Sequence, residues 1–304
     1  MAGDCNNQVG GSSVVGRCRL LDTLHTSSSA VYGITVLQDE LYVARDRSNV
    51  IEVFDVTAAL TSLMTCHRQL VVGVTTLPQQ VRPLDITSCV KTRCLYMSDA
   101  ANCRIHRVET TSGRVLDSWR VRVDARAWGI SVTVAGTVLV CCRGAGLLCE
   151  YSSSGQLVRR IQLPEDVSQP VHAVEVASKF IVSHYDIDES AGARVCVVDD
   201  TGARVIQRDH SQLRQPHHLA VLSDDGRSLV AVADCGNNRV KLLDASTFSV
   251  VAVVVDWRLR RPHRLCVRQG RLYVGQWDGR VLIYQLLADV SASTSTAQQL
   301  SAAT

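Results

Sequence analysis

Short apolar runs alternate with polar turn residues along most of this chain, and the alternation is clearest from Gln215 to Val255. Four apolar runs of four to eight residues, rich in Val, Leu and Ala, lie in this stretch. The dipeptides Asp225-Gly226 and Gly236-Asn237 separate runs, and Gly and Asn tolerate the positive φ of tight turns. No helical period continues across the runs. The pattern therefore predicts a four-stranded antiparallel meander.

The same unit recurs along the chain, so the meander is one copy of a repeat. Its opening position is found at intervals of 44 to 52 residues, at Tyr32, Leu84, Trp128, His172, His217 and His263. A repeat of roughly 40–50 residues with four strands per copy is typical of propeller blades. We therefore predict an all-β fold, a six-bladed β-propeller.

The two ends of the repeat array complement each other. After Val281–Tyr284 the chain becomes polar, so the sixth copy lacks a fourth strand. Arg17–Leu24 matches the outermost strand of another copy, Gly155–Leu163. We predict that the N-terminal strand completes the last blade, which would remove two exposed sheet edges. The predicted propeller domain spans residues 14–288, and the small polar residues of 1–13 and 289–304 are predicted to be mobile tails.

One copy carries a family resemblance. Residues 216–244 read PHHLAV, then LVAVADCGNNRVKLLD after a turn, and this resembles an NHL repeat, roughly PxGIxV followed by LYVADxxNxRVxVFD. Residues 31–55 and 82–109 match well, whereas Arg143 and His184 replace the family's Asp in the third and fourth copies. The resemblance covers about residues 17–287, and this part of the chain is similar to the C-terminal domain of tripartite-motif (TRIM-NHL) proteins. It implies a recognition propeller; without a Cys/His zinc ladder or heptad segment in the sequence, ligase activity is not inferred.

Composition adds limits on compartment and partners. The 304 residues carry a formal charge of only +3, and 29 of the 32 basic residues are arginine. No run of 18 apolar residues and no secretory leader pattern is present, so we expect no membrane partner. The 12 cysteines include no CxxC pair, and several lie within predicted strands, as reduced core thiols do. We therefore predict a cytoplasmic protein with no cofactor, and we expect no DNA partner.

Arginine concentrates on one predicted face. In a four-stranded blade, the loop that leads into the first strand and the turn between the second and third strands lie on the same side, called here the upper face. Most loops of this face are basic, above all Asp256–Arg264, DWRLRRPHR. The predicted ligand-binding residues are Tyr32, Arg82, Arg126, Trp128, His217, His218, Trp257, Arg260, Arg261, His263 and Arg264.

Two kinds of ligand fit this face. Arginine pairs well with carboxylate and phosphate and stacks on flat rings, so an acidic protein or peptide partner is expected. RNA is the other candidate, because the resemblance to TRIM-NHL propellers implies a basic RNA-binding face and the aromatic residues could stack on bases. The sequence favours a non-catalytic recognition or scaffold propeller and leaves protein and RNA open.

The alternative is a metal-dependent enzyme that uses histidines at the channel mouth. In the predicted register, His172, His217 and His263 occupy equivalent positions, and imidazole is a common zinc ligand. This resembles the six-bladed lyase that finishes peptide amidation, but there the ligands come from alternate blades, which here would place Leu84 in the set. A lactonase-type site is also disfavoured, because Asp85 is the only carboxylate in the next column.

Other conspicuous residues are interpreted as structural. Asp99 and Asp234 are predicted to hold the second-to-third turn of their blades through Arg104 and Arg239. Three tyrosines that share one blade position are predicted to pack between blades: Tyr42, Tyr96 and Tyr273.

Overall fold

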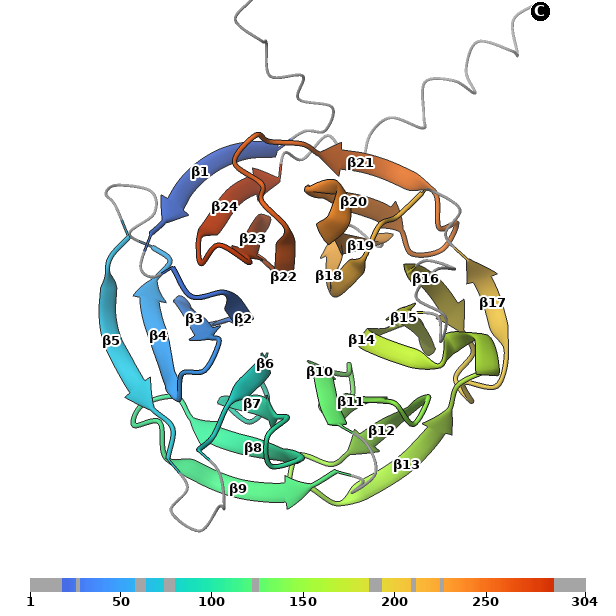
Figure 1. Cartoon of the computed structure of the whole chain (residues 1–304), viewed down its shortest axis with the longest axis horizontal. Coiled ribbons are helices and arrows are strands. Elements are labelled where there is room, and N and C mark those ends of the chain that lie inside the picture. Colours follow the sequence, from blue (N-terminus) through green and yellow to red (C-terminus); the bar gives the residue numbers. More distant parts are fainter. Residues whose placement is uncertain are drawn as a thin grey trace, which may run out of the picture.

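The computed structural model describes residues 18–25, 28–57, 64–73, 80–121, 126–185, 193–208, 212–224 and 227–286. These residues form six four-stranded antiparallel sheets arranged as blades around a central axis (Figure 1). The first strand of each blade lies next to the axis and the outermost strand lies at the rim. This confirms the predicted all-β six-bladed propeller.

The blades have equivalent strand orders. The innermost strands are β2 (Val31–Leu37), β6 (Pro83–Cys89), β10 (Arg126–Val132), β14 (Gln169–Val176), β18 (Pro216–Asp224) and β22 (Pro262–Arg268). The second strands are β3 (Glu40–Arg45), β7 (Cys94–Asp99), β11 (Val138–Arg143), β15 (Lys179–Tyr185), β19 (Arg227–Asp234) and β23 (Arg271–Gln276).

The third strands are β4 (Val50–Asp55), β8 (Arg104–Glu109), β12 (Leu147–Tyr151), β16 (Ala193–Val198), β20 (Arg239–Asp244) and β24 (Val281–Leu286). The outermost strands are β5 (Cys66–Val71), β9 (Val115–Arg120), β13 (Leu157–Gln162), β17 (Val205–Arg208), β21 (Val250–Val254) and β1 (Cys18–Leu24). Two short 3-10 turns are η2 (Glu165–Val167) and η4 (Cys235–Asn237).

The N-terminal strand closes the ring, as predicted. β1 pairs antiparallel with β24, from Cys18 opposite Leu286 to Leu24 opposite Val281. The sixth blade therefore contains both ends of the described chain (Figure 1). This pairing covers the edge of β24, which would otherwise present unpaired N–H and C=O groups.

Apolar layers between neighbouring blades form the core. Tyr42 packs in a cluster that also contains Leu95 and Met97 of the next blade. Tyr96 lies in the following cluster, and Tyr273 lies between the sixth and first blades. All three rings are buried, so the predicted packing of the tyrosines between blades is confirmed.

The predicted ties at the second-to-third turn are only half right. Asp234 pairs with Arg239, with 2.6 Å between Oδ2 and Nε. Asp99 instead accepts from the Asn102 side chain at 2.6 Å and contacts His106 at 3.2 Å. Arg104 is directed to Ser118, because the buried His106 occupies the position beside the carboxylate.

The two mobile tails stay a prediction, because residues 1–13 and 289–304 lie outside the described residues. No cysteine of the described ranges forms a disulfide. The helical segments among these residues are too short to cross a bilayer.

Candidate functional site

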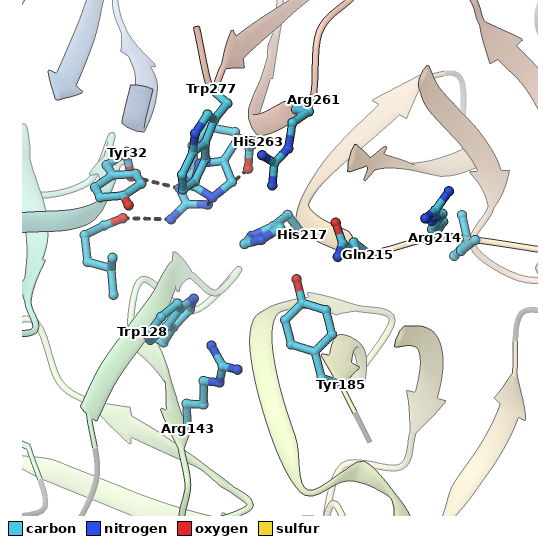
Figure 2. A pocket seen from close by; sticks show the side chains of 13 residues that line it. Tyr32, Trp128, Arg143, Tyr185, Arg214, Gln215, His217, Arg261, His263 and Trp277 are labelled. Carbon is cyan, nitrogen blue, oxygen red and sulfur yellow. Dashed lines mark hydrogen bonds between the residues drawn. The ribbon is translucent and has the colours of Figure 1, made fainter. Parts of the chain in front are cut away.

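A cavity of about 620 Å³ opens at the upper end of the central axis (Figure 2). It is called here the upper cavity. All six blades contribute to its wall. Its lining residues are Tyr32, Leu84, Trp128, Arg143, Tyr185, Leu213, Arg214, Gln215, His217, Arg261, His263, Arg264 and Trp277.

The fold brings together about half of the residues predicted to bind a ligand. Six of them line the upper cavity: Tyr32, Trp128, His217, Arg261, His263 and Arg264. Arg126 lines a shallow neighbouring hollow with Trp128 and Arg143. Arg82, Arg260 and Trp257 are exposed but lie outside the cavity wall, and Trp257 is 71% exposed. His218 is buried on the axis below.

Four large side chains of the cavity, those of Arg143, Tyr185, Arg214 and Trp277, were not among the predicted ligand residues. Arg143 and Tyr185 end the second strands β11 and β15, and Trp277 directly follows β23. The end of a second strand lies on the upper face beside the start of the first strand, to which it pairs. The sequence could therefore have placed the last residues of each second strand on the upper face, and likewise Arg214, which lies just before β18.

Arginines stack on the aromatic wall of the cavity. The Arg143 guanidinium lies 4.6 Å from the ring centre of Trp128 and 5.3 Å from that of Tyr185. Arg261 lies 5.0 Å from the ring centre of Trp277. Such contacts hold a guanidinium by its flat face and leave its N–H edges available for an anion.

The cavity wall is strongly cationic. Among the residues that the structure describes, four arginines and no carboxylate line it. Two histidines also line it, His217 and His263, whose rings lie 4.2 Å apart between centres. Burial, followed by the charge of Arg264, holds the pKa of both histidines well below the ordinary value. At neutral pH the imidazoles are uncharged, and the positive charge belongs to the arginines.

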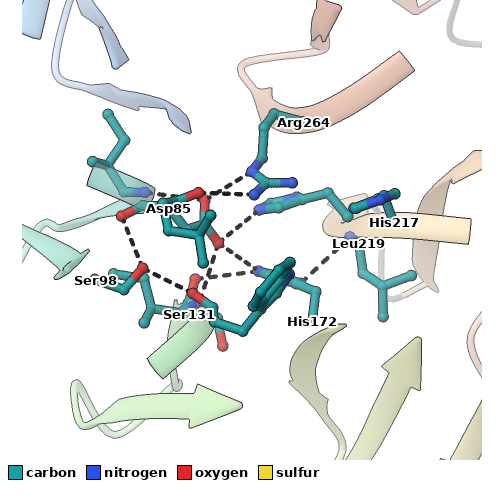
Figure 3. Close-up of polar contacts among 12 residues, drawn as sticks. Asp85, Ser98, Ser131, His172, His217, Leu219 and Arg264 are labelled. Atoms are coloured by element: carbon teal, nitrogen blue, oxygen red, sulfur yellow. Dashed lines mark hydrogen bonds and ion pairs between the residues drawn. The ribbon is translucent and has the colours of Figure 1, made fainter. Parts of the chain in front are cut away.

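Arg264 forms the floor of the upper cavity and connects three blades (Figure 3). Its guanidinium donates to the carbonyl oxygens of Tyr32 and Leu84, each at 2.8 Å, and of His263 at 3.0 Å. Its Nε also lies 3.4 Å from the Asp85 carboxylate. Both side chains are fully buried, so the two opposite charges neutralise each other in a site that water does not reach.

Asp85 is the acceptor at the centre of the axis. It accepts from the backbone N–H of Ile86 at 3.0 Å and of Ile130 at 3.1 Å. Burial acts to raise the pKa of Asp85, but His218 and Arg264 act in the opposite direction and leave the pKa below its ordinary value. The carboxylate is therefore ionised at neutral pH.

His172 lies in this axial layer, one position away from the predicted register. It is 3.7 Å from Asp85 and stacks on His218, with 3.7 Å between ring centres. A bulge follows Pro170 in β14, just as bulges follow Pro83 and Pro262. Alignment on these prolines, rather than on the histidines, places Val171 at the mouth and His172 on the axis. The predicted set of His172, His217 and His263 is therefore divided between two layers.

Two glycines leave room for the axial layer. A Cβ on Gly129 would lie 2.3 Å from the Val171 carbonyl oxygen and 2.7 Å from the His172 ring. A Cβ on Gly33 would lie 2.7 Å from the Ile86 side chain. The chain thus approaches itself so closely at these two positions that any larger residue would displace a neighbouring strand.

The axial layer brings together three potential metal ligands, Asp85, His172 and His218, all buried. The set does not fit a divalent cation well. His172 Nε2 donates to the Ile130 carbonyl at 3.2 Å, and its Nδ1 accepts from the Leu219 N–H at 3.4 Å, so both nitrogens are engaged. Arg264 already supplies the cation that Asp85 requires. A second buried cation would meet its repulsion without another carboxylate in the group.

A second, smaller cavity of about 370 Å³ lies on the other side of the axial layer. It is called here the lower cavity. Among the described residues, apolar and hydroxyl side chains line most of it, the buried His172 and His218 lie at the axis, and Glu175 is the one carboxylate of the lining. The two ends of the axis therefore differ in chemistry, and the strong positive charge belongs to the upper one.

Solved structures share the fold at low sequence identity. A virginiamycin B lyase from Staphylococcus aureus, a catalytically inactive variant with quinupristin, has a TM-score of 0.62 at 12% identity, over 89% of this chain and 99% of that one. The WD40 propeller domain of Doa1 has a TM-score of 0.61 at 12% identity, over 91% and 99%. A streptogramin B lyase has a TM-score of 0.60 at 15% identity, over 90% and 88%.

At 12–15% identity these similarities support the propeller fold alone. No family model and no curated protein matches the chain. The resemblance to NHL repeats therefore stays a prediction from the sequence.

Proposed function

We propose that this propeller is a non-catalytic recognition platform that binds an acidic segment of a protein partner in the upper cavity. The observation that carries the proposal is the cavity wall, whose described residues combine four arginines with four aromatic rings and include no carboxylate. Aromatic and arginine side chains are the residues that dominate the energy of protein interfaces. A localised concave site of this size suits a short segment of chain.

Protein is favoured over RNA because arginines already lie over the tryptophan rings on which bases would stack. Sequence-tolerant RNA binding needs open ring faces on which bases stack. The rings of Trp128 and Trp277 carry Arg143 and Arg261, and Arg258 lies 4.4 Å from the ring centre of the exposed Trp257. These stacked arginines present N–H edges, which suit carboxylate or phosphate groups more than bases.

The metal-dependent lyase or lactonase alternative lacks comparable support. A metal site here would need His172 and Asp85 as ligands. Both nitrogens of His172 are bonded to backbone groups, and Asp85 is paired with Arg264. The WD40 domain among the structural neighbours and the resemblance to NHL propellers are both consistent with recognition.

The proposal is tested by affinity capture from cell extract with matched arginine variants. Arg143→Gln with Arg261→Gln removes two charges of the cavity, and Arg160→Gln removes one exposed arginine from the outer strand β13. We expect specific proteins that bind the wild type and the β13 variant and are lost from the cavity variant, with or without ribonuclease treatment. Loss of the captured proteins after ribonuclease treatment would favour RNA. Capture of the same proteins by the cavity variant and by the wild type would contradict the proposal.

A further inference from the structure

We propose that the segment bound in the upper cavity carries a phosphate monoester, as on a phosphorylated serine, threonine or tyrosine side chain. The inference rests on the proposed function and names the chemistry of the group that the cavity recognises.

The positive charge of the cavity exceeds what a single side-chain carboxylate can neutralise. Arg143, Arg214 and Arg261 line it, and none of the three forms an ion pair with a carboxylate in the described part of the chain. Arg264 is the only lining arginine with such a partner, Asp85. A side-chain carboxylate brings one negative charge, whereas a phosphate monoester brings about 1.5 to 2 and three acceptor oxygens. Arg143 and Arg261, whose guanidinium groups are directed toward the middle of the cavity (Figure 2), match the phosphate more closely than a single carboxylate.

The arginines are held in place by independent contacts and come from different blades. Arg143 ends β11 of the third blade, stacks on Trp128, and its Nε donates to the Gln169 side chain at 3.3 Å. Arg261 precedes β22 of the sixth blade and stacks on Trp277. Figure 2 shows both side chains directed toward the middle of the cavity, on either side of His217. Such preorganisation lowers the entropy lost when an anion is bound.

His217 adds an imidazole to the same wall. Its ring lines the cavity near the middle, between Arg143 and Arg261 (Figure 2). A neutral imidazole can present an N–H to a phosphate oxygen. The cavity therefore offers guanidinium edges and an imidazole to the same small volume.

The same reasoning separates a phosphorylated side chain from a nucleic-acid backbone. A backbone phosphodiester carries one charge, and successive phosphates are spread along the strand. Here the arginines are concentrated around a single cavity, and the exposed Arg82 and Arg260 lie outside its wall. A compact dianion uses this arrangement better than a chain of monoanions.

The test measures binding of fluorescent peptide pools with degenerate flanking residues. One set has serine or tyrosine at the fixed central position, one has the phosphorylated residue, and one has glutamate; single-stranded oligouridylate serves as the RNA probe. We expect the phosphorylated pools to bind the wild type at least about tenfold more tightly than their unphosphorylated counterparts. The difference is lost in the Arg143→Gln/Arg261→Gln variant and kept in Arg160→Gln, with equal thermal unfolding of all three proteins.

The other outcomes separate this inference from the proposed function. Glutamate pools that bind as tightly as phosphorylated ones, with the same dependence on the two arginines, would overturn the phosphate and leave acidic-segment recognition standing. Arginine-dependent binding of oligouridylate without any peptide binding would overturn both. Absence of binding by every pool would also overturn the phosphate inference.

Discussion

Arg264 is the residue on which the centre of the ring depends. Its guanidinium donates to carbonyl oxygens of the first, second and sixth blades, and it neutralises the Asp85 carboxylate. Apolar side chains would be the usual filling for such a position, since burying an ion pair costs desolvation energy. The guanidinium both closes the axis and contributes positive charge to the floor of the upper cavity.

Removal of either partner should destabilise the fold strongly. Arg264→Gln leaves the Asp85 carboxylate buried without its cation, and we expect a loss of about 3–5 kcal/mol in the free energy of unfolding. Asp85→Asn should cost a similar amount, because it isolates the guanidinium. Urea unfolding of both single variants and of the double variant measures the coupling. A double variant whose loss equals the sum of the single losses would contradict the pairing.

The buried histidines of the axial layer and of the upper cavity should make the fold sensitive to mild acid. Burial holds the pKa of His172, His218 and His263 below the ordinary value near 6.5. Below that pH the unfolded chain gains protons that the folded chain does not, so stability falls as pH falls. We expect about 1.4 kcal/mol lost per pH unit for each histidine that stays neutral. Urea unfolding at several pH values between 7.5 and 5 measures the slope, and a flat profile would contradict the assignment.

At the scale of single elements, β1 is the piece that turns an array of blades into a closed ring. Its pairing with β24 was predictable, because the last copy lacked a strand and the N-terminal residues matched the missing one. The strand is only seven residues long and comparatively exposed, so its contribution is largely topological.

Deletion of β1 should open the ring. A chain that begins at residue 25 exposes the edge of β24, and we expect a lower melting temperature together with self-association through that edge. A chain that begins at residue 17 keeps the pairing and serves as the control. Circular dichroism and size-exclusion chromatography compare the two, and a monomeric, fully stable truncation at residue 25 would contradict the closure.

The first strands explain what the sequence did and did not predict. Repeat spacing and turn residues predicted six blades, because each copy must form the same meander to bury its faces. The predicted register was wrong in the fourth copy, because it aligned His172 with the other histidines, whereas alignment of Pro170 with Pro83 and Pro262 places His172 on the axis. Side chains at the ends of second strands, such as Tyr185 and Trp277, were missed because apolar periodicity says nothing about what converges across a ring.

At the scale of the whole molecule, the ring creates one axis with two chemically different ends. The upper cavity gathers arginines and aromatic rings from separate blades, whereas the lower cavity is lined mainly by apolar and hydroxyl side chains. The axial layer of Asp85, His172, His218 and Arg264 lies between them, since Arg264 lines the upper cavity and both histidines line the lower one. No single repeat contains this site, which exists only when six blades close.

Site-specific photocrosslinking tests most directly whether the upper end is the recognition surface. A photoreactive phenylalanine analogue replaces Trp277 at the upper cavity or the 81% exposed Val134 at the lower cavity. Irradiation in cells, followed by identification of the attached molecules, compares the two ends of the same folded propeller. The account predicts protein crosslinks from position 277 that vanish with Arg143→Gln/Arg261→Gln, and none above background from position 134. Crosslinks from position 134 alone, or attachment of RNA in place of protein at position 277, would contradict it.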